Sequence, residues 1–198
     1  MKTAADRHCR TTLAAVSALP GLSLAEWIVL SLVEEHPTHG FAVAALTAKE
    51  GEVGRAWHLP RPIVYRCLDH LTELNLVRVE STEAGNRGPR RSVLTTTRAG
   101  RSATTAWLRQ PVAHVRDMRS ELLVKLALSL RRGLPSAPLI AAQRAALAPV
   151  QEALERQHRA ETGFGQILAS WRVENIRAVM RFLDDIEVSA GDPVQASR

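Results

Sequence analysis

A predicted amphipathic helix that runs into a basic hairpin constrains this chain more than any other feature. The helix opens at residues 60–62, and apolar residues recur every three or four positions across 64–74. Two short extended runs follow, 77–82 and 92–97, separated by a turn rich in Gly and Arg at 83–91. A helix followed by a basic two-stranded wing is typical of the winged helix-turn-helix, whose helix enters the major groove of DNA.

The positive charge of the chain is concentrated around this hairpin. The 198 residues carry a net charge of +6. Residues 51–132 hold 15 Lys and Arg against 7 Asp and Glu, a net of +8, whereas 1–50 and 133–198 each carry −1. An excess of this kind is compatible with a polyanionic partner. Its localisation favours double-stranded DNA over a general contribution to solubility.

Catalysis, metal binding and cofactor binding find no support in the sequence. The chain has two cysteines, Cys9 and Cys67, and neither lies in a spacing that suits a zinc site or a disulfide framework. The seven histidines are scattered, and no Gly-rich phosphate loop or nucleophile motif is present. No apolar run reaches the length of a membrane span. We therefore expect a cytoplasmic protein that is not an enzyme, with no cofactor and no membrane contact.

The order of the segments predicts a mostly α-helical protein with a small β-wing. Ser23, with Glu26 three residues later, has the spacing of a capping box that starts the first helix. We expect helices over 24–35, 41–46, 61–74, 98–108, 117–132, 138–160 and 164–188. The predicted units are a flexible arm over 1–21, a winged-helix DNA-binding domain over 22–132, a C-terminal helical dimerisation domain over 133–188 and a disordered tail over 189–198.

The two last helices predict a homodimer. Each carries an apolar stripe, and two such helices cannot form a globular core by themselves. They must bury their stripes against the first domain or against a second chain, and Asn175 falls at a spacing that suits the seam of such a pair. The residues expected at the dimer interface are Phe164, Leu168, Trp171, Val179, Phe182, Leu183 and Ile186.

Several short motifs, in order, resemble the PadR family of bacterial transcriptional regulators over residues 24–132. No single motif is specific to the family, but the order and spacing of the motifs are. They are Thr38-His39-Gly40-Phe41, the segment 64–71 with Tyr65, Leu74-Asn75-Leu76-Val77, Gly88-Pro89-Arg90-Arg91, the segment 94–100 and the segment 120–126.

The resemblance implies a role in transcriptional regulation, and the sequence departs from the family pattern at two places. Family members are dimeric repressors, often of transporter or detoxification genes, and some release DNA on binding a small hydrophobic effector. The length and the paired C-terminal helices are similar to the larger subgroup of the family. Pro60-Arg61-Pro62-Ile63 replaces the family's Ser/Gly-containing helix start, and Asn75 stands where Gly is frequent. Asn tolerates the left-handed conformation, so the helix can still end there.

The residues expected to contact DNA lie on the second helix of the motif and on the wing. Arg61 and Arg66 can contact phosphate or guanine, Ile63 can meet a thymine methyl, and the Tyr65 hydroxyl can reach the backbone. The complete predicted set is Arg61, Ile63, Tyr65, Arg66, Arg87, Arg90 and Arg91, with Trp107 and Trp171 as candidate lining of an effector pocket.

The sequence thus predicts a dimeric repressor that binds a pseudo-palindromic operator. A protein-interaction adaptor that keeps the winged fold is one alternative, and the unusual start at Pro60-Arg61-Pro62-Ile63 is the feature that supports it. A small-molecule sensor whose ligand pocket dominates its biology is another. A third is a different winged-helix family such as MarR, which the choice of dimer helices would distinguish.

Overall fold

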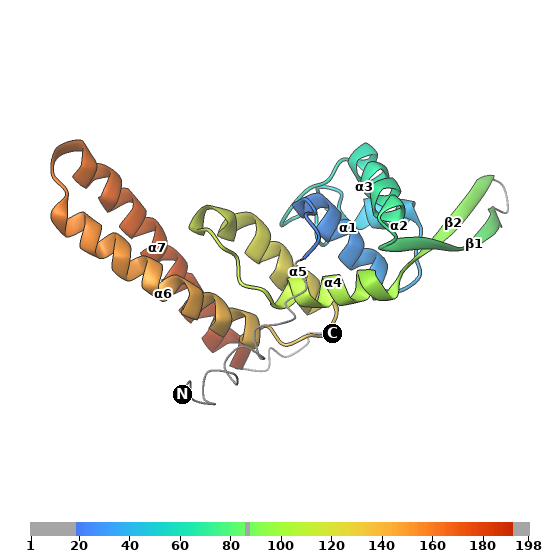
Figure 1. The fold of residues 1–198 in the computed structure, drawn as a ribbon. Helices are drawn as coiled ribbons and strands as arrows, with labels where there is room; N and C mark the ends of the chain where they lie inside the picture. The colour runs from blue at the N-terminus through green and yellow to red at the C-terminus, as the bar shows by residue number, and fades with distance from the viewer. Residues whose placement is uncertain (1–18, 86–87, 192–198) are drawn as a thin grey trace, which may run out of the picture.

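A computed structural model describes residues 19–85 and 88–191, with the backbone alone for 83–85, 88–91 and 188–191. The described chain is a winged-helix unit followed by a long antiparallel helical hairpin that projects away from the wing (Figure 1). The mostly helical fold with a two-stranded wing confirms the predicted fold class. The elements are α1 (Leu24–Glu35), α2 (Gly40–Leu46), α3 (Arg61–Glu73), β1 (Val77–Gly85), β2 (Gly88–Thr96), α4 (Arg98–Arg109), α5 (Leu123–Arg131), α6 (Ala137–Ala160) and α7 (Gly163–Gly191).

Helix α1 lies at the centre of the winged-helix core. Every residue from 27 to 33 is buried, and the helix contacts α2, α3, α4, α5 and β2. The Trp27 ring stacks on Trp107 of α4 with 5.1 Å between ring centroids, and the Lys125 ammonium of α5 lies 4.9 Å from the Trp107 ring centroid. This stack joins three helices, and it places Trp107 in the core.

Glu26 connects the start of α1 to the end of α3. Its carboxylate accepts hydrogen bonds from the Ser23 backbone N–H at 2.6 Å and from the Ser23 hydroxyl, so the predicted capping box is confirmed. The other carboxylate oxygen lies 2.5 Å from Nδ1 of His70. Burial raises the pKa of the Glu26 carboxyl, but the hydrogen bonds from Ser23 and His70 outweigh burial, and the pKa lies below its ordinary value.

Glu26→Gln should destabilise the protein at pH 7 and not at low pH. Glutamine keeps the shape and the capping spacing but removes the charge, so we expect a loss of about 1 kcal/mol in the free energy of unfolding. Because the folded-state pKa is below 4.5, the carboxylate stabilises the fold fully above pH 4.5, and this contribution disappears as the pH falls through the folded-state pKa. Urea unfolding at a series of pH values measures the difference, and a difference that persists at the acid end would contradict this account.

The end of α3 and the start of α4 are held in close contact. Asn75 has φ 55, and the Leu76 N–H bonds the Leu71 carbonyl while the Asn75 N–H bonds that of Thr72, a pattern typical of a left-handed helix stop. The Leu76 carbonyl then accepts from the Thr97 N–H at 2.9 Å, and the Thr97 hydroxyl accepts from the Gly100 N–H. A Cβ built on Gly100 would lie 2.2 Å from the Leu76 carbonyl oxygen, so only glycine allows this approach.

The wing is longer than the sequence indicates. Strands β1 and β2 pair antiparallel from Val77 with Thr96 out to Gly85 with Gly88, so most of the segment 83–91 that was expected to be a turn is strand. Gly and Arg favour a turn locally, but the pairing of the preceding residues carries the ladder outward past an irregularity near Glu83. At the base of the wing, Thr38 pairs with Leu94 through two backbone hydrogen bonds, which fix the wing beside the start of α2.

The helix expected over 117–132 is not continuous. A 3₁₀ turn over Val115–Asp117 leads into a π-helical turn over Met118–Leu122, and only Leu123–Arg131 is regular α-helix. The cause lies in two separate cores: Leu122 packs with α6 and α7, whereas Val124 packs with α1. The wide turn rotates the chain so that neighbouring residues face different cores.

Two side chains anchor the segment between α4 and the 3₁₀ turn. The Lys125 ammonium, nearly completely buried, donates to the Gln110 carbonyl at 2.8 Å and pairs with Glu121 at 2.7 Å. The side-chain amide of Gln143 in α6, also buried, bonds both the N–H and the carbonyl of Val112. The helical hairpin is therefore attached to the winged-helix unit through the backbone of residues 110–112.

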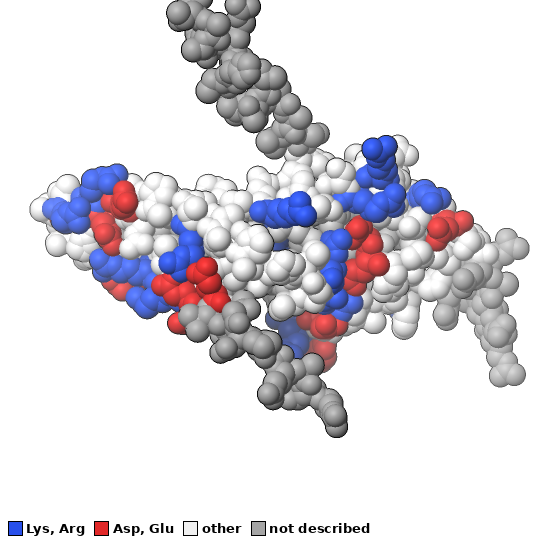
Figure 2. All heavy atoms as spheres, turned by 90° about the horizontal axis from the view of Figure 1, so that it is seen from below, with Lys and Arg blue, Asp and Glu red and all other residues white. Residues whose placement is uncertain are grey.

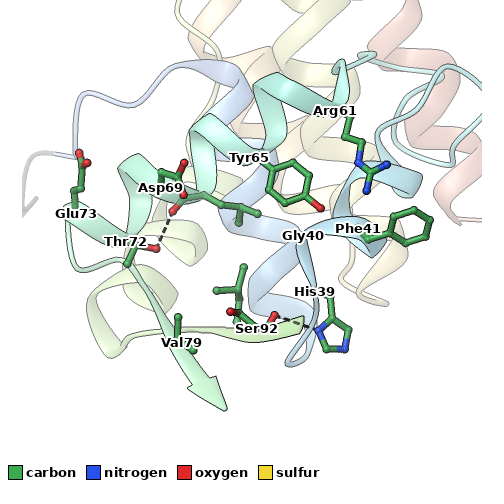
Figure 3. A pocket seen from close by; sticks show the side chains of 12 residues that line it. His39, Gly40, Phe41, Arg61, Tyr65, Asp69, Thr72, Glu73, Val79 and Ser92 are labelled. Carbon is green, nitrogen blue, oxygen red and sulfur yellow. Dashed lines mark hydrogen bonds between the residues drawn. The ribbon is translucent and has the colours of Figure 1, made fainter. Parts of the chain in front are cut away.

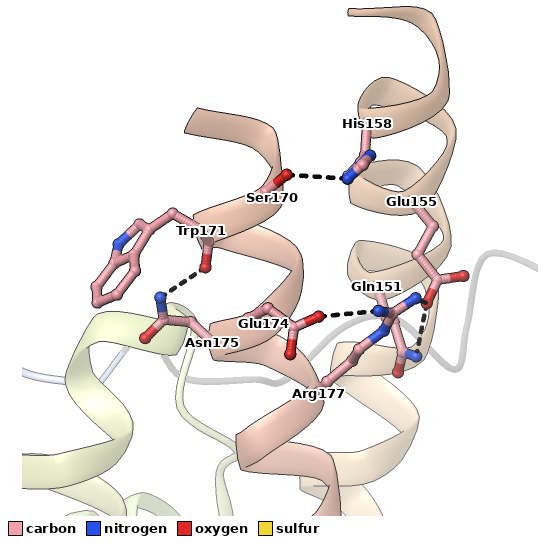
Figure 4. A network of polar contacts seen from close by, with 8 residues as sticks. All are labelled: Gln151, Glu155, His158, Ser170, Trp171, Glu174, Asn175 and Arg177. Atoms are coloured by element: carbon pink, nitrogen blue, oxygen red, sulfur yellow. Dashed lines mark hydrogen bonds and ion pairs between the residues drawn. The ribbon is translucent and has the colours of Figure 1, made fainter. Parts of the chain in front are cut away.

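Helices α6 and α7 form an antiparallel pair joined at Gly163, whose φ is 58. One face of α7 packs on α6 through the buried residues Ala169, Val173, Ile176 and Leu183. Polar contacts flank this seam: Arg177 bonds Glu155 and Glu174, and Ser170 lies 3.0 Å from His158 (Figure 4). Across the described ranges, none of the helices has the length and hydropathy needed to cross a membrane.

Candidate nucleic-acid interface

Arg61 is held between two aromatic rings at the start of α3. Its guanidinium carbon lies 5.0 Å from the centroid of Phe41 in α2 and 5.8 Å from that of Tyr65, one turn further along α3 (Figure 3). Both rings are partly exposed, Phe41 by 59% and Tyr65 by 41%. A guanidinium stacked in this way keeps its N–H donors in a fixed plane that faces outward. The geometry suits bidentate recognition of guanine or phosphate.

The close packing of α2 on α3 depends on Gly40. A Cβ at this position would lie 3.0 Å from the side chain of Leu68 and from the Tyr65 ring, so a larger residue would require these side chains to shift. The contact brings Phe41 beside Arg61. His39, just before the helix, lies with Nδ1 3.1 Å from the Ser92 carbonyl of the wing. The motif Thr38-His39-Gly40-Phe41 thus positions both the guanidinium and the wing.

A groove of about 930 Å³ separates the exposed side of α3 from the wing (Figure 3). Its α3 wall carries Arg61 and Tyr65 near the start of the helix and two carboxylates, Asp69 and Glu73, further along. Val79 and Ser92 line the opposite wall on the two strands. The sequence predicts no DNA contact for Phe41, Asp69 or Glu73, and Phe41 is named above only as part of the motif Thr38-His39-Gly40-Phe41. Asp69 follows Tyr65 by four residues, a spacing that puts both on one helix face and was available as a signal.

The predicted DNA-contacting residues fall into three groups. Arg61, Tyr65 and Arg66 are exposed on α3. Ile63 is only partly exposed and packs against the winged-helix core. Arg87 lies outside the described residues, and for Arg90 and Arg91 the structure describes the backbone in β2 but not the side chains.

Several cations of the helical hairpin have carboxylate partners, unlike those of α3. On the face shown in Figure 2, basic and acidic side chains are mixed over the hairpin at the left of the view. Arg144 pairs with Asp184 and Glu187, and Arg177 pairs with Glu155 and Glu174. In the part of the chain that the structure describes, no ion pair involves Arg61 or Arg66. Their charge is available to a polyanion.

The cysteine in α3 has the character of a structural residue. Cys67 is buried among core side chains, and burial raises the pKa of its thiol to about 11, with the Glu26 charge acting in the same direction. Little thiolate forms near neutral pH under these conditions, so the side chain is a poor nucleophile. Within residues 19–85 and 88–191 there is also no cluster of three or more His, Cys, Asp or Glu side chains that could hold a metal ion.

Among the described residues, neither tryptophan predicted for an effector pocket lines the groove beside α3 or the cavity at the junction of α4, α5 and α6. Trp107 is covered by Trp27, and Trp171 lies 69% exposed on the side of α7 that faces away from α6 (Figure 4). A cavity of about 380 Å³ lies instead at the junction of α4, α5 and α6, with Arg109, Arg132 and Leu139 among its lining. Arg132 pairs with Glu34 through Nη2, whereas its buried Nη1 has no hydrogen-bond partner within the described residues.

The seven predicted interface residues divide between the two faces of α7. Leu183 is buried against α6 within the chain, and Val179 and Ile186 pack against the same cluster. Phe164, Leu168, Trp171 and Phe182 point outward and remain exposed. The Asn175 side chain donates to the Trp171 carbonyl one turn earlier at 2.7 Å, on the outward side.

Comparison with known proteins finds one family match and several similar solved structures. Residues 29–106 match the model of the transcriptional regulator PadR-like family. No curated protein matches the chain. Among solved structures, crystal structures of Bacillus subtilis PadR are similar: that protein with operator DNA shows 16% identity over 85% of this chain and 99% of its own, with a TM-score of 0.44. The same protein alone, 16% identical, and with p-coumaric acid, 15% identical, each cover 85% of this chain and 96% of their own, with TM-scores of 0.37 and 0.36. The winged-helix part of this chain, residues 29–106, is therefore similar to the transcriptional regulator PadR-like family.

Proposed function

We propose that this protein is a homodimeric transcriptional repressor that binds a pseudo-palindromic DNA operator and excludes polymerase from it. The observation that carries the proposal is the Arg61 guanidinium, exposed at the start of α3, stacked on Phe41 and Tyr65, and without a carboxylate partner in the described chain. A fixed, unpaired guanidinium at this point of a winged helix faces the major groove when α3 is docked there.

The outward face of α7 supports the dimer. Leu168, Trp171, Asn175, Ala178 and Phe182 follow one another at alternating steps of three and four residues, and Leu168, Trp171 and Phe182 are exposed apolar side chains. This heptad spacing is typical of a helix that pairs with another helix. With a second copy on this face, two α3 helices about 34–36 Å apart would reach successive major grooves on one side of the duplex.

The cavity at the junction of α4, α5 and α6 supports binding of a small effector. The cavity lies between the winged-helix unit and the hairpin, so a ligand there would change the angle between them. Its lining combines apolar Leu108 and Leu139 with the guanidinium of Arg132. This combination suits a small apolar molecule with an acidic group. Such a compound should weaken operator binding in the assay described next.

The deciding experiment measures binding of the purified protein to its own upstream DNA and to a scrambled duplex by fluorescence anisotropy across a salt series. We expect a Kd in the nanomolar range for the upstream DNA, binding at least about 1,000-fold weaker for the scrambled duplex, and steep loss of affinity as salt rises.

Two controls make the result decisive. A library of random duplexes replaces the upstream DNA if the operator lies elsewhere in the genome. Equal and weak binding to every duplex, with no sequence enriched from the library, would contradict the repressor and favour an adaptor or a sensor.

A further inference from the structure

The centre of the exposed side of α3 carries a carboxylate in place of a cation. Asp69 follows Tyr65 by one helical turn and Arg61 by two, and all three line the groove between α3 and the wing (Figure 3). Asp69 is exposed, and within the described residues its carboxylate takes part in no ion pair or hydrogen bond. Glu73, one turn later at the end of α3, shares these properties.

A carboxylate at Asp69 acts against both the helix and DNA binding in general. Asp69 and Glu73 are like charges four residues apart in the second half of α3, where negative charge opposes the helix dipole. A negative charge in the groove also repels the phosphates that Arg61 and the wing attract. The position would favour any neutral or basic residue if phosphate contact were the whole function of this face.

The chemistry of an ionised carboxylate restricts what it can contact in a major groove. Its oxygens accept hydrogen bonds and donate none. Guanine presents the acceptors O6 and N7, and thymine presents O4, so both repel it. Adenine offers the N6 amino group beside the acceptor N7. Cytosine offers its N4 amino group and has no acceptor of its own on the major-groove edge, and is therefore the base that a carboxylate tolerates best.

We propose that Asp69 is a specificity-determining residue that accepts a hydrogen bond from the N4 amino group of one cytosine in each operator half-site. The inference rests on the proposed function, because it requires α3 to lie in a major groove. Asp69 is eight residues from Arg61, which corresponds to about 12 Å along the helix axis. The cytosine should therefore lie roughly three to four base pairs from the base or phosphate that Arg61 contacts.

The test combines selection with single-base replacement. The full chain is used to enrich binding sites from a random duplex library, and each position of the best half-site is then changed to the other three bases. Loss of one C·G pair should weaken wild-type binding by about 5- to 150-fold at one position per half-site. Asp69→Asn should prefer A·T at that same position, since asparagine bonds adenine N6 and N7. Asp69→Ala should bind all four variants of that position alike.

Glu73→Gln is the matched control, because it removes one negative charge from the same face at the last residue of α3. It should strengthen binding to all duplexes alike and leave the preferred base unchanged at every position. If Asp69→Asn does the same, Asp69 has only a general electrostatic effect and the proposal is overturned. Failure of the wild-type chain to enrich any sequence would overturn the repressor function itself, whereas enriched sites with no cytosine that depends on Asp69 would overturn this inference alone. Asp69 is exposed, and circular dichroism confirms that the variants remain folded.

Discussion

Trp171→Asp should convert the protein from a dimer to a monomer and abolish tight operator binding. The indole is 69% exposed at the centre of the outward face of α7, and it lies between Leu168 and Phe182 in the heptad series. An aspartate there places an unpaired charge in an apolar contact, which desolvation makes unfavourable. A monomer contacts a single half-site, so the affinity for the full operator should fall by about 100-fold or more. Light scattering after size exclusion and fluorescence anisotropy measure the two effects.

Gln166→Asp is the control for this substitution. Gln166 is exposed on the same helix, and it does not belong to the heptad series that contains Trp171. The variant should remain dimeric and should bind the operator as the wild type does. A dimeric Trp171→Asp protein would remove α7 from the interface and would leave the dimer to be sought on another surface.

Gly100→Ala should cause a large loss of stability in the winged-helix unit. The new Cβ would lie 2.2 Å from the Leu76 carbonyl oxygen, a backbone atom that cannot rotate away. Leu76 is itself held by its N–H bond to Leu71 and by the Thr97 N–H. Relief of the clash requires α4 to move away from the end of α3, and we expect a cost of about 3 kcal/mol. In a chain of this size that corresponds to a fall of roughly 6–12 °C in Tm.

Gly21→Ala tests whether the loss comes from the clash and not from the removal of a glycine. A Cβ on Gly21 meets no atom within 4 Å, so its Tm should stay within about 2 °C of the wild type. A Gly100→Ala protein with an unchanged Tm would show that α4 can shift without cost. The strict position of the wing relative to α3 would then need another explanation.

Local sequence rules were sufficient where a structural feature depends on a few neighbouring residues. The capping box of Ser23 and Glu26 and the left-handed stop at Asn75 each involve contacts within about five positions, and both are present. The order of helices followed the apolar periodicity for the same reason. The predicted limits of the domains remain predictions.

Features that depend on distant partners could not be read from the sequence. The length of the wing depends on the pairing of two strands, and the π-helical turn over Met118–Leu122 depends on two cores that the sequence does not separate. Lys125 looks like a surface cation in a helical pattern, yet its ammonium is buried against Trp107 because Gln110 and Glu121 satisfy it. Burial of this kind is visible only when the three elements are assembled.

The candidate site also combines residues that the sequence predicts with contacts that only the assembled structure shows. Arg61 and Tyr65 were singled out by their residue types and by the resemblance, and the structure adds that Phe41 completes a stack around the guanidinium. Positive charge marks Arg61 as a candidate DNA contact, and Asp69 lacks that mark, although its spacing from Tyr65 is visible in the sequence. For Arg87, Arg90 and Arg91 a contact with DNA remains a prediction.

The hairpin is attached at Val112, so a small rotation at this point produces a large displacement at its far end. The Gln143 side chain hydrogen-bonds the Val112 backbone just after α4. Helix α6 extends 17 residues beyond Gln143 to Ala160, which is about 25 Å of helix. A rotation of about 10° at Val112 therefore moves the far end of the hairpin by about 4 Å. If two chains pair along α7, a displacement of about 4 Å at the far end of the hairpin therefore corresponds to a change of only about 10° at Val112. In such a dimer, these proportions would allow fine adjustment of the distance between the two α3 helices.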